Sequence, residues 1–144
     1  MRMESGFLHW GHDISPEENQ YQAGLNFAIS YKKPFDFIGK KNLLKIKSLK
    51  LERRFVMLVL KDNTPGKPLL LYEEPIYLDD KIIGKTTSGN YSFNYNKNLS
   101  FGYINSKLTN EQLVDKDLYI EIENKKYPAE LLIKPLKLLN FKNI

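Results

Sequence analysis

The sequence predicts a mainly β fold, in which a small antiparallel β-barrel follows an arm of mixed α and β structure. From Arg54 onward, short apolar runs are separated by turn residues, which is the pattern of short strands in a barrel or sandwich. In LYIEIE, residues 118–123, apolar and polar residues alternate, so one face of this strand is expected inside and the other in solvent. No amphipathic helix of about 10–15 residues lies between the runs, which argues against parallel βαβ units.

The expected strands follow one another from residue 54 to residue 133. They are RFVMLVL (54–60), PLLLY (68–72), IYL (76–78), KIIGKTTSG (81–89), LSFGYI (99–104), LYIEIE (118–123) and YPAELLI (127–133). Turn-forming sequences such as NTPGKP and NKK lie between them. One short helical turn is expected at TNEQL, because Thr109 and Gln112 have the spacing of a capping box.

Residues 1–50 are expected to form the arm and residues 51–144 the barrel domain. In the arm, Ser15 and Pro16 have the pattern of a helix opening, and AGLNFAISY, residues 23–31, suggests a strand. After Gly39, KKNLLKIKSLK predicts a short helix with its lysines on the solvent side and one apolar side of Leu43, Leu44, Ile46 and Leu49. The arm is too short for a core of its own, so it must pack on the barrel or on another surface.

The composition argues against several classes of function. The net charge is +5, and residues 32–54 alone carry +7, yet arginine is scarce and aromatic residues do not interleave with these lysines, so no nucleic-acid partner is expected. No apolar run approaches the roughly 20 residues that cross a bilayer, and no secretory signal opens the chain, so no membrane partner and a cytoplasmic location are expected. The absence of cysteine excludes disulfides and thiolate sites.

The stretch RMESGFLHWGHDIS, residues 2–15, concentrates groups that could carry chemistry. It holds both histidines, His9 and His12, next to Asp13 and near Glu4. No metal site is expected, because two histidines three residues apart face the same way in a helix, and the two glycines of the stretch disfavour one. No nucleophilic triad is expected either, since no serine lies in a sharp GxSxG-type turn.

Recognition of a ligand is the remaining interpretation of this stretch. A carboxylate accepts two parallel hydrogen bonds from an amino group and a ring N–H, and aromatic rings cover the faces of such a heterocycle. Glu4 with Phe7 and Trp10 is suited to this task. The alternative is that Phe7 and Trp10 anchor the core and that Glu4 is an ordinary surface residue.

A series of motifs favours ligand recognition over the alternative. The segments RMESGFLHWGHDISPEE, QAGLNFAI, DFIGKKNLL, GKTTSGNYSFNYNKNLSFGYI and KYPAELL, in this order, resemble the C-terminal half of the folate-dependent T-protein family of the glycine cleavage system. HWGHDI is similar to the variant found in dimethylglycine and sarcosine dehydrogenases. The resemblance runs from Arg2 to about Leu136 and implies the C-terminal barrel of a three-domain cloverleaf with tetrahydrofolate in its central cavity.

The resemblance also implies roles for individual residues. Glu4 corresponds to the glutamate that binds the pterin ring, and Lys33 is nearest to the basic residue that reaches the folate tail. The TTSGNY loop, Phe7 and Trp10 are expected cavity walls. No catalytic residue is expected here, because the family's catalytic aspartate belongs to the N-terminal half, which the matching region lacks.

Two functions of different classes follow. The first is a C-terminal segment of a tetrahydrofolate-dependent aminomethyltransferase or T-protein-like dehydrogenase, inactive alone and completed by an N-terminal half or a partner chain. The alternative is a non-catalytic β-barrel interaction module that docks on a protein through Phe7, Trp10 and Phe27.

Overall fold

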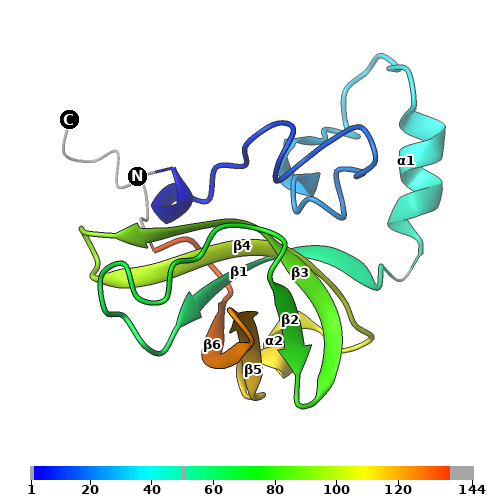
Figure 1. Cartoon of the computed structure of the whole chain (residues 1–144). Coiled ribbons are helices and arrows are strands. Elements are labelled where there is room, and N and C mark those ends of the chain that lie inside the picture. The colour runs from blue at the N-terminus through cyan, green and yellow to red at the C-terminus, as the bar shows by residue number, and fades with distance from the viewer. Residues whose placement is uncertain (1, 50, 137–144) are drawn as a thin grey trace.

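The computed structural model describes residues 2–49 and 51–136 of the chain. Six antiparallel strands form a closed barrel in the order β1-β4-β3-β2-β5-β6, and β6 pairs with β1 to complete it (Figure 1). The strands are β1 (Arg53–Leu60), β2 (Pro75–Leu78), β3 (Lys81–Ser92), β4 (Lys97–Asn105), β5 (Leu118–Ile122) and β6 (Lys125–Leu132). The predicted mainly β class is therefore confirmed. The boundary predicted between residues 50 and 51 stays a prediction.

Most of the expected strands form, but PLLLY does not. Residues 68–72 run across β3 without joining the sheet, and Leu69 and Leu71 are exposed. Only Leu70 enters the core, and it packs so closely on Gly89 that a Cβ there would lie 2.3 Å from the Leu70 Cβ. The strand prediction for PLLLY was therefore wrong: of its three leucines, Leu70 alone is buried, and the segment forms a loop.

The barrel has apolar packing on both sides of its wall. One cluster fills the interior and includes Leu58, Ile76 and Ile120. A second cluster lies on the outer surface, where Val59, Leu99 and Phe101 pack against Met3 of the arm. This double burial explains why seven consecutive residues of β4, 98–104, are buried although a half-exposed strand would alternate.

The helix α2 (Asn110–Val114) begins at the predicted capping box. The Gln112 amide donates to the Thr109 hydroxyl at 3.3 Å, and the Thr109 amide donates to the Gln112 side chain at 2.9 Å. Leu113 of this helix is fully buried in the barrel interior.

The arm, residues 2–49, contains η1 (Met3–Ser5), η2 (Asn26–Ala28) and α1 (Lys40–Lys47). The predicted lysine-rich helix is confirmed as α1, but none of its residues is buried. Figure 1 shows α1 at the far end of the arm, away from the sheet. No helix within the described ranges is long and apolar enough to cross a membrane.

Two predictions in the arm were wrong. Residues 23–31 form turns and η2 in place of a strand, and their apolar side chains share no face: Ala23 is buried whereas Phe27 is 82% exposed. Ser15 does not open a helix: its hydroxyl donates to the Glu18 carboxylate at 2.7 Å and accepts from the Glu17 amide at 3.1 Å, and the residues that follow form turns. These side-chain bonds close a turn that competes with helix formation.

Candidate functional site

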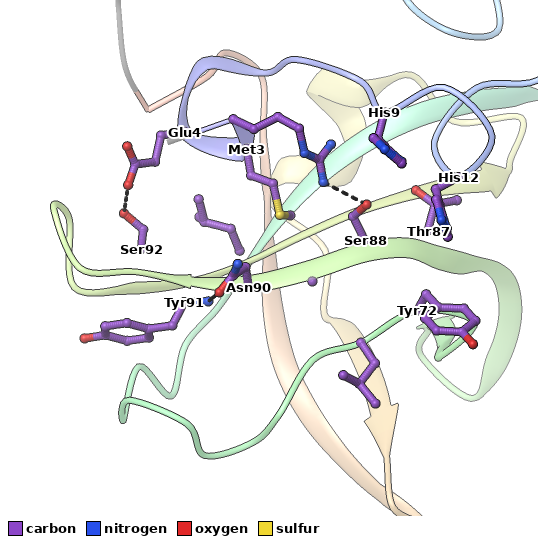
Figure 2. A pocket seen from close by; sticks show the side chains of 14 residues that line it. Met3, Glu4, His9, His12, Tyr72, Thr87, Ser88, Asn90, Tyr91 and Ser92 are labelled. Carbon is purple, nitrogen blue, oxygen red and sulfur yellow. Dashed lines mark hydrogen bonds between the residues drawn. The ribbon is translucent and has the colours of Figure 1, made fainter.

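A polar pocket of about 420 Å³ lies where the start of the arm crosses the barrel. One side consists of Arg2, Met3 and Glu4 with His9 and His12, and the other consists mainly of residues 87–92 of β3. Figure 2 shows Glu4 and Ser92 at one end and His9, His12 and Tyr72 toward the other. Residues 87–91 of the TTSGNY stretch line the pocket, but they belong to strand β3 and not to a loop.

Glu4 lines the polar pocket, although the residue is only 3% exposed. The Ser92 hydroxyl donates to it at 2.6 Å, and the Asn94 amide donates to both carboxylate oxygens, at 3.2 and 3.0 Å. These donors come from the end of β3 and the turn that follows it. A carboxylate held at a pocket wall can accept hydrogen bonds from amino and ring N–H groups of a ligand.

The turn η1 fixes the position of Glu4. Met3 is buried in the outer cluster, which places the next side chain toward β3. Gly6 ends the turn with φ +72°, and a Cβ there would lie 2.8 Å from Cγ of Pro135. Position 6 therefore needs glycine for its backbone conformation and for its close approach to the chain after β6.

Asp13 is the main polar anchor between the arm and the barrel. Its side chain is completely buried and accepts hydrogen bonds from the hydroxyls of Thr87 and Ser88 at 2.6 and 2.7 Å. It also accepts from the His9 amide at 2.8 Å and from the Arg2 guanidinium at 2.5 Å. Burial alone would raise the pKa of Asp13, but these hydrogen bonds together hold it below its ordinary value.

A second anchor joins the arm to β1. Glu18 accepts from Arg53 at 2.8 Å, and Arg53 in turn lies over the ring of Tyr103, 4.3 Å from its centroid. Burial opposes ionisation of Glu18, but the bonds from Ser15 and Arg53 lower its pKa. The Tyr103 hydroxyl donates to the Asp13 carbonyl at 2.9 Å, and its pKa is raised to about 12 by burial and by the charge of Glu18.

The two histidines are exposed at the open end of the pocket. Their ring centroids lie 4.9 Å apart, and Tyr72 meets His12 edge-on at 6.4 Å. The rings thus approach each other although the segment is not helical, contrary to the reasoning from sequence. Within residues 2–49 and 51–136, no group of three or more histidine and acidic side chains could hold a metal ion.

The structure does not bring all the predicted site residues together. Lys33 is exposed beside Phe35, 6.0 Å from the ring centroid, and does not line the polar pocket. Phe7 and Trp10 do not line it either, so they do not cover a ring held by Glu4 in this geometry. They line a separate apolar groove of about 880 Å³ between the arm and the barrel.

Arg2, Asp13, Ser92 and Asn94 are the site residues that reasoning from sequence missed. Their signal was indirect: Arg2 and Asp13 belong to the motif that contains Glu4, and Ser92 and Asn94 belong to the conspicuous GNYSFNYN stretch. Nothing in the sequence pattern alone shows that these stretches, about 90 residues apart, share hydrogen bonds.

Comparison with known proteins agrees with this architecture. Residues 53–137 match the family model of the glycine cleavage T-protein C-terminal barrel domain. The chain belongs to this family. Its fold is similar to that of the glycine cleavage system aminomethyltransferase T from Bartonella henselae, with a TM-score of 0.77 at 21% identity, over 94% of this chain and 37% of that one.

The similarity to curated proteins extends into the arm. The chain is 36% identical to human mitochondrial dimethylglycine dehydrogenase over 138 residues, which cover 96% of this chain and 15% of that protein. It is 35% identical to the aminomethyltransferase of Listeria innocua over 135 residues, covering 94% of this chain and 35% of that protein. The chain therefore spans only a small part of these relatives.

Proposed function

We propose that this chain is the C-terminal segment of a tetrahydrofolate-dependent aminomethyltransferase, or of a T-protein-like dimethylglycine or sarcosine dehydrogenase. Such a protein transfers a one-carbon unit from a glycine-type amine to folate. Membership of the T-protein barrel family and the similarity to proteins with these names support the proposal. The observation that carries it is the buried Glu4 carboxylate at the wall of the polar pocket.

Glu4 would orient the pterin by accepting hydrogen bonds from its amino group and a ring N–H. The Asn94 amide, which donates to both oxygens, does not line the pocket and would keep the carboxylate in place from the other side. The volume of about 420 Å³ falls in the range of small-molecule pockets, roughly 300–1,000 Å³.

Lys33 would meet the folate tail, whose glutamates are acidic. The exposed position of Lys33 within the lysine-rich segment 32–54 suits a flexible anionic tail that extends beyond the polar pocket. Such contacts are screened by salt, so Lys33 would contribute less than the buried Glu4.

The chemistry itself would need groups outside this chain. No described side chain is proposed as catalytic, and a preceding half or a partner chain would hold the reactive carbon. We also propose that the protein is cytoplasmic.

Calorimetric titration with 5-formyltetrahydrofolate tests the proposal. The chain is titrated alone and after co-expression with the part of Listeria innocua aminomethyltransferase that precedes its matched region. Binding is expected in the assembly and much less in the chain alone. Lys33→Gln is expected to weaken it slightly, with Lys116→Gln, exposed and outside segment 32–54, as the matched control. An assembly that binds no reduced folate would exclude the function.

The alternative, a non-catalytic interaction module, is favoured by the exposure of Phe7, Trp10 and Phe27, at 57%, 65% and 82%. Such a module would associate with another protein without any effect of reduced folate. Concentration-dependent sedimentation of the chain, with and without 5-formyltetrahydrofolate, distinguishes it from the first function.

A further inference from the structure

The apolar groove has walls from both parts of the molecule. Phe7, Trp10 and Phe27 line it from the arm, while Phe55 of β1, Ile133 and Pro135 line it from the barrel side. With about 880 Å³, it is larger than the polar pocket.

Large side chains in this groove are left open to solvent. Phe27 is 82% exposed, Trp10 65% and Ile133 48%. Isolated exposed apolar residues are normal, but several that line one concavity mark a surface that another polypeptide covers.

The lengths of the relatives indicate what covers it. The matched region is 35% of the Listeria innocua aminomethyltransferase, and the matching family model is a C-terminal barrel domain. Because the barrel is the C-terminal domain, the rest of such a protein lies on the N-terminal side of the matched region. The turn that follows Arg2 forms part of the groove, since Ser5 and Gly6 line it.

The same turn separates the groove from the polar pocket. Met3 and Glu4 of η1 line the pocket, whereas Ser5 of the same turn lines the groove. A polypeptide in the groove would press on the turn that carries Glu4. Ser5 and Glu4 are neighbours in this three-residue turn, so a shift of Ser5 in the groove would also shift Glu4 in the pocket.

We propose that the apolar groove is the docking surface for the polypeptide that precedes the matched region in aminomethyltransferases. We further propose that docking there and ligand binding in the polar pocket strengthen each other through η1. This coupling rests on the proposed folate function, whereas docking does not. Coupling between two sites is reciprocal, so reduced folate must tighten docking by the factor by which docking tightens folate binding.

The absence of cysteine from the sequence provides a clean test of docking. Phe27→Cys and Ile133→Cys place one thiol on each wall of the groove, and Ile82→Cys places one at an exposed position of β3 that does not line it. Each full-length variant is co-expressed with the preceding part of the Listeria innocua protein, and maleimide labelling is read at the peptide that holds the thiol. Circular dichroism of the purified assembly verifies that both chains are folded.

Labelling of both groove thiols is expected to slow by about tenfold or more in the assembly, because an interface core excludes solvent, while Ile82→Cys is unaffected. Unchanged labelling in a folded assembly, or failure of the folded partner to bind, would overturn the docking surface. Protection that appears in the chain alone as its concentration rises would overturn the assigned occupant in favour of a second copy.

The coupling is read from the docking affinity with and without 5-formyltetrahydrofolate. A tighter assembly with the folate is expected. If folate binds the assembly but leaves docking unchanged, the coupling is wrong while both docking and the proposed function stand. If no folate binds, the proposed function fails and docking stands.

Discussion

The barrel and the arm are held by different kinds of contact. In the barrel, six strands close on themselves and their apolar side chains pack on both faces of the wall. In the described part of the arm, Met3 and Ala23 are the buried apolar residues, and Asp13 and Glu18 connect it to the barrel through directed hydrogen bonds. The difference teaches that the barrel is held mainly by apolar packing within its own sheet, whereas the arm takes its position from a few polar anchors and from Met3.

The candidate site lies where these two regions meet. Glu4 comes from the arm, but Ser92 and Asn94, which hold its carboxylate, come from the barrel. Loss of the polar anchors should therefore damage the polar pocket while leaving the sheet intact.

The largest expected effect is a cavity in the barrel interior. Ile120 is fully buried, so Ile120→Ala should lower the free energy of unfolding by about 2–5 kcal/mol. The arm should be lost together with the barrel, and urea denaturation measures this. Ile82→Ala, at a position 62% exposed, is the matched control and should cost less than about 1 kcal/mol. Equal costs for both variants would contradict the packing described for the barrel.

Asp13→Ala should have a smaller and local effect. It leaves the Thr87, Ser88 and His9 donors without their acceptor, which costs about 1–3 kcal/mol. Amide hydrogen exchange should become faster in residues 2–29 and stay unchanged in the barrel strands. Asp36→Ala is the control, because the Asp36 side chain is 78% exposed and pairs with Lys40 of its own segment. A uniform loss of protection over both regions would contradict separate anchoring.

Acid should loosen the arm before it unfolds the barrel. The pKa values of Asp13 and Glu18 are lowered in the folded protein, from ordinary values of 3.8 and 4.5. A lowered folded-state pKa gives stability that is fully present above the ordinary value and is lost as pH falls through the folded one. The hydrogen-exchange rates of the arm amides, corrected for intrinsic rates, should therefore increase as the pH falls below about 4.5. Each unit by which a pKa is lowered corresponds to about 1.4 kcal/mol of stability that is lost in acid.

The double variant Asp13→Asn, Glu18→Gln serves as the control for this pH effect. It lacks both titrating groups, so arm protection should be lower at neutral pH and nearly independent of pH between 3 and 7. Loosening of the wild-type arm on raising the pH would contradict the sign of both shifts.

The smallest expected effect concerns the cap of α2. Thr109→Ala removes the acceptor for the Gln112 amide and should cost about 1 kcal/mol in urea denaturation. Thr109→Ser keeps a hydroxyl and should stay close to the wild type. A larger loss for Ser than for Ala would show that the methyl group, and not the cap, matters at this position.

The same contrast explains what could be predicted from the sequence. Alternation in LYIEIE and the spacing of Thr109 and Gln112 are local patterns, and both elements form as expected. The predictions for the arm were wrong at Ser15, where the side chain bonds to Glu18, and at residues 23–31, which form turns and η2 with Ala23 buried. Apolar periodicity has no information about side-chain hydrogen bonds of this kind.

For the site, the sequence indicated a carboxylate but not its surroundings. Glu4 lies at a concave wall, whereas Phe7, Trp10 and Lys33 lie outside the polar pocket. Proximity in the sequence placed Phe7 and Trp10 with Glu4, but Gly6 turns the chain between them, so their side chains reach a different groove.

The most direct test of the central claim is the affinity of the assembly for 5-formyltetrahydrofolate with Glu4 or with Gln at position 4. Gln keeps the shape of the side chain but replaces one acceptor oxygen with an NH₂ donor and removes the charge. Calorimetry at pH 7 is expected to show a loss of about tenfold to hundredfold, the effect of a hydrogen bond to a charged group. Equal affinity for the two forms would contradict a role of Glu4 in holding the pterin.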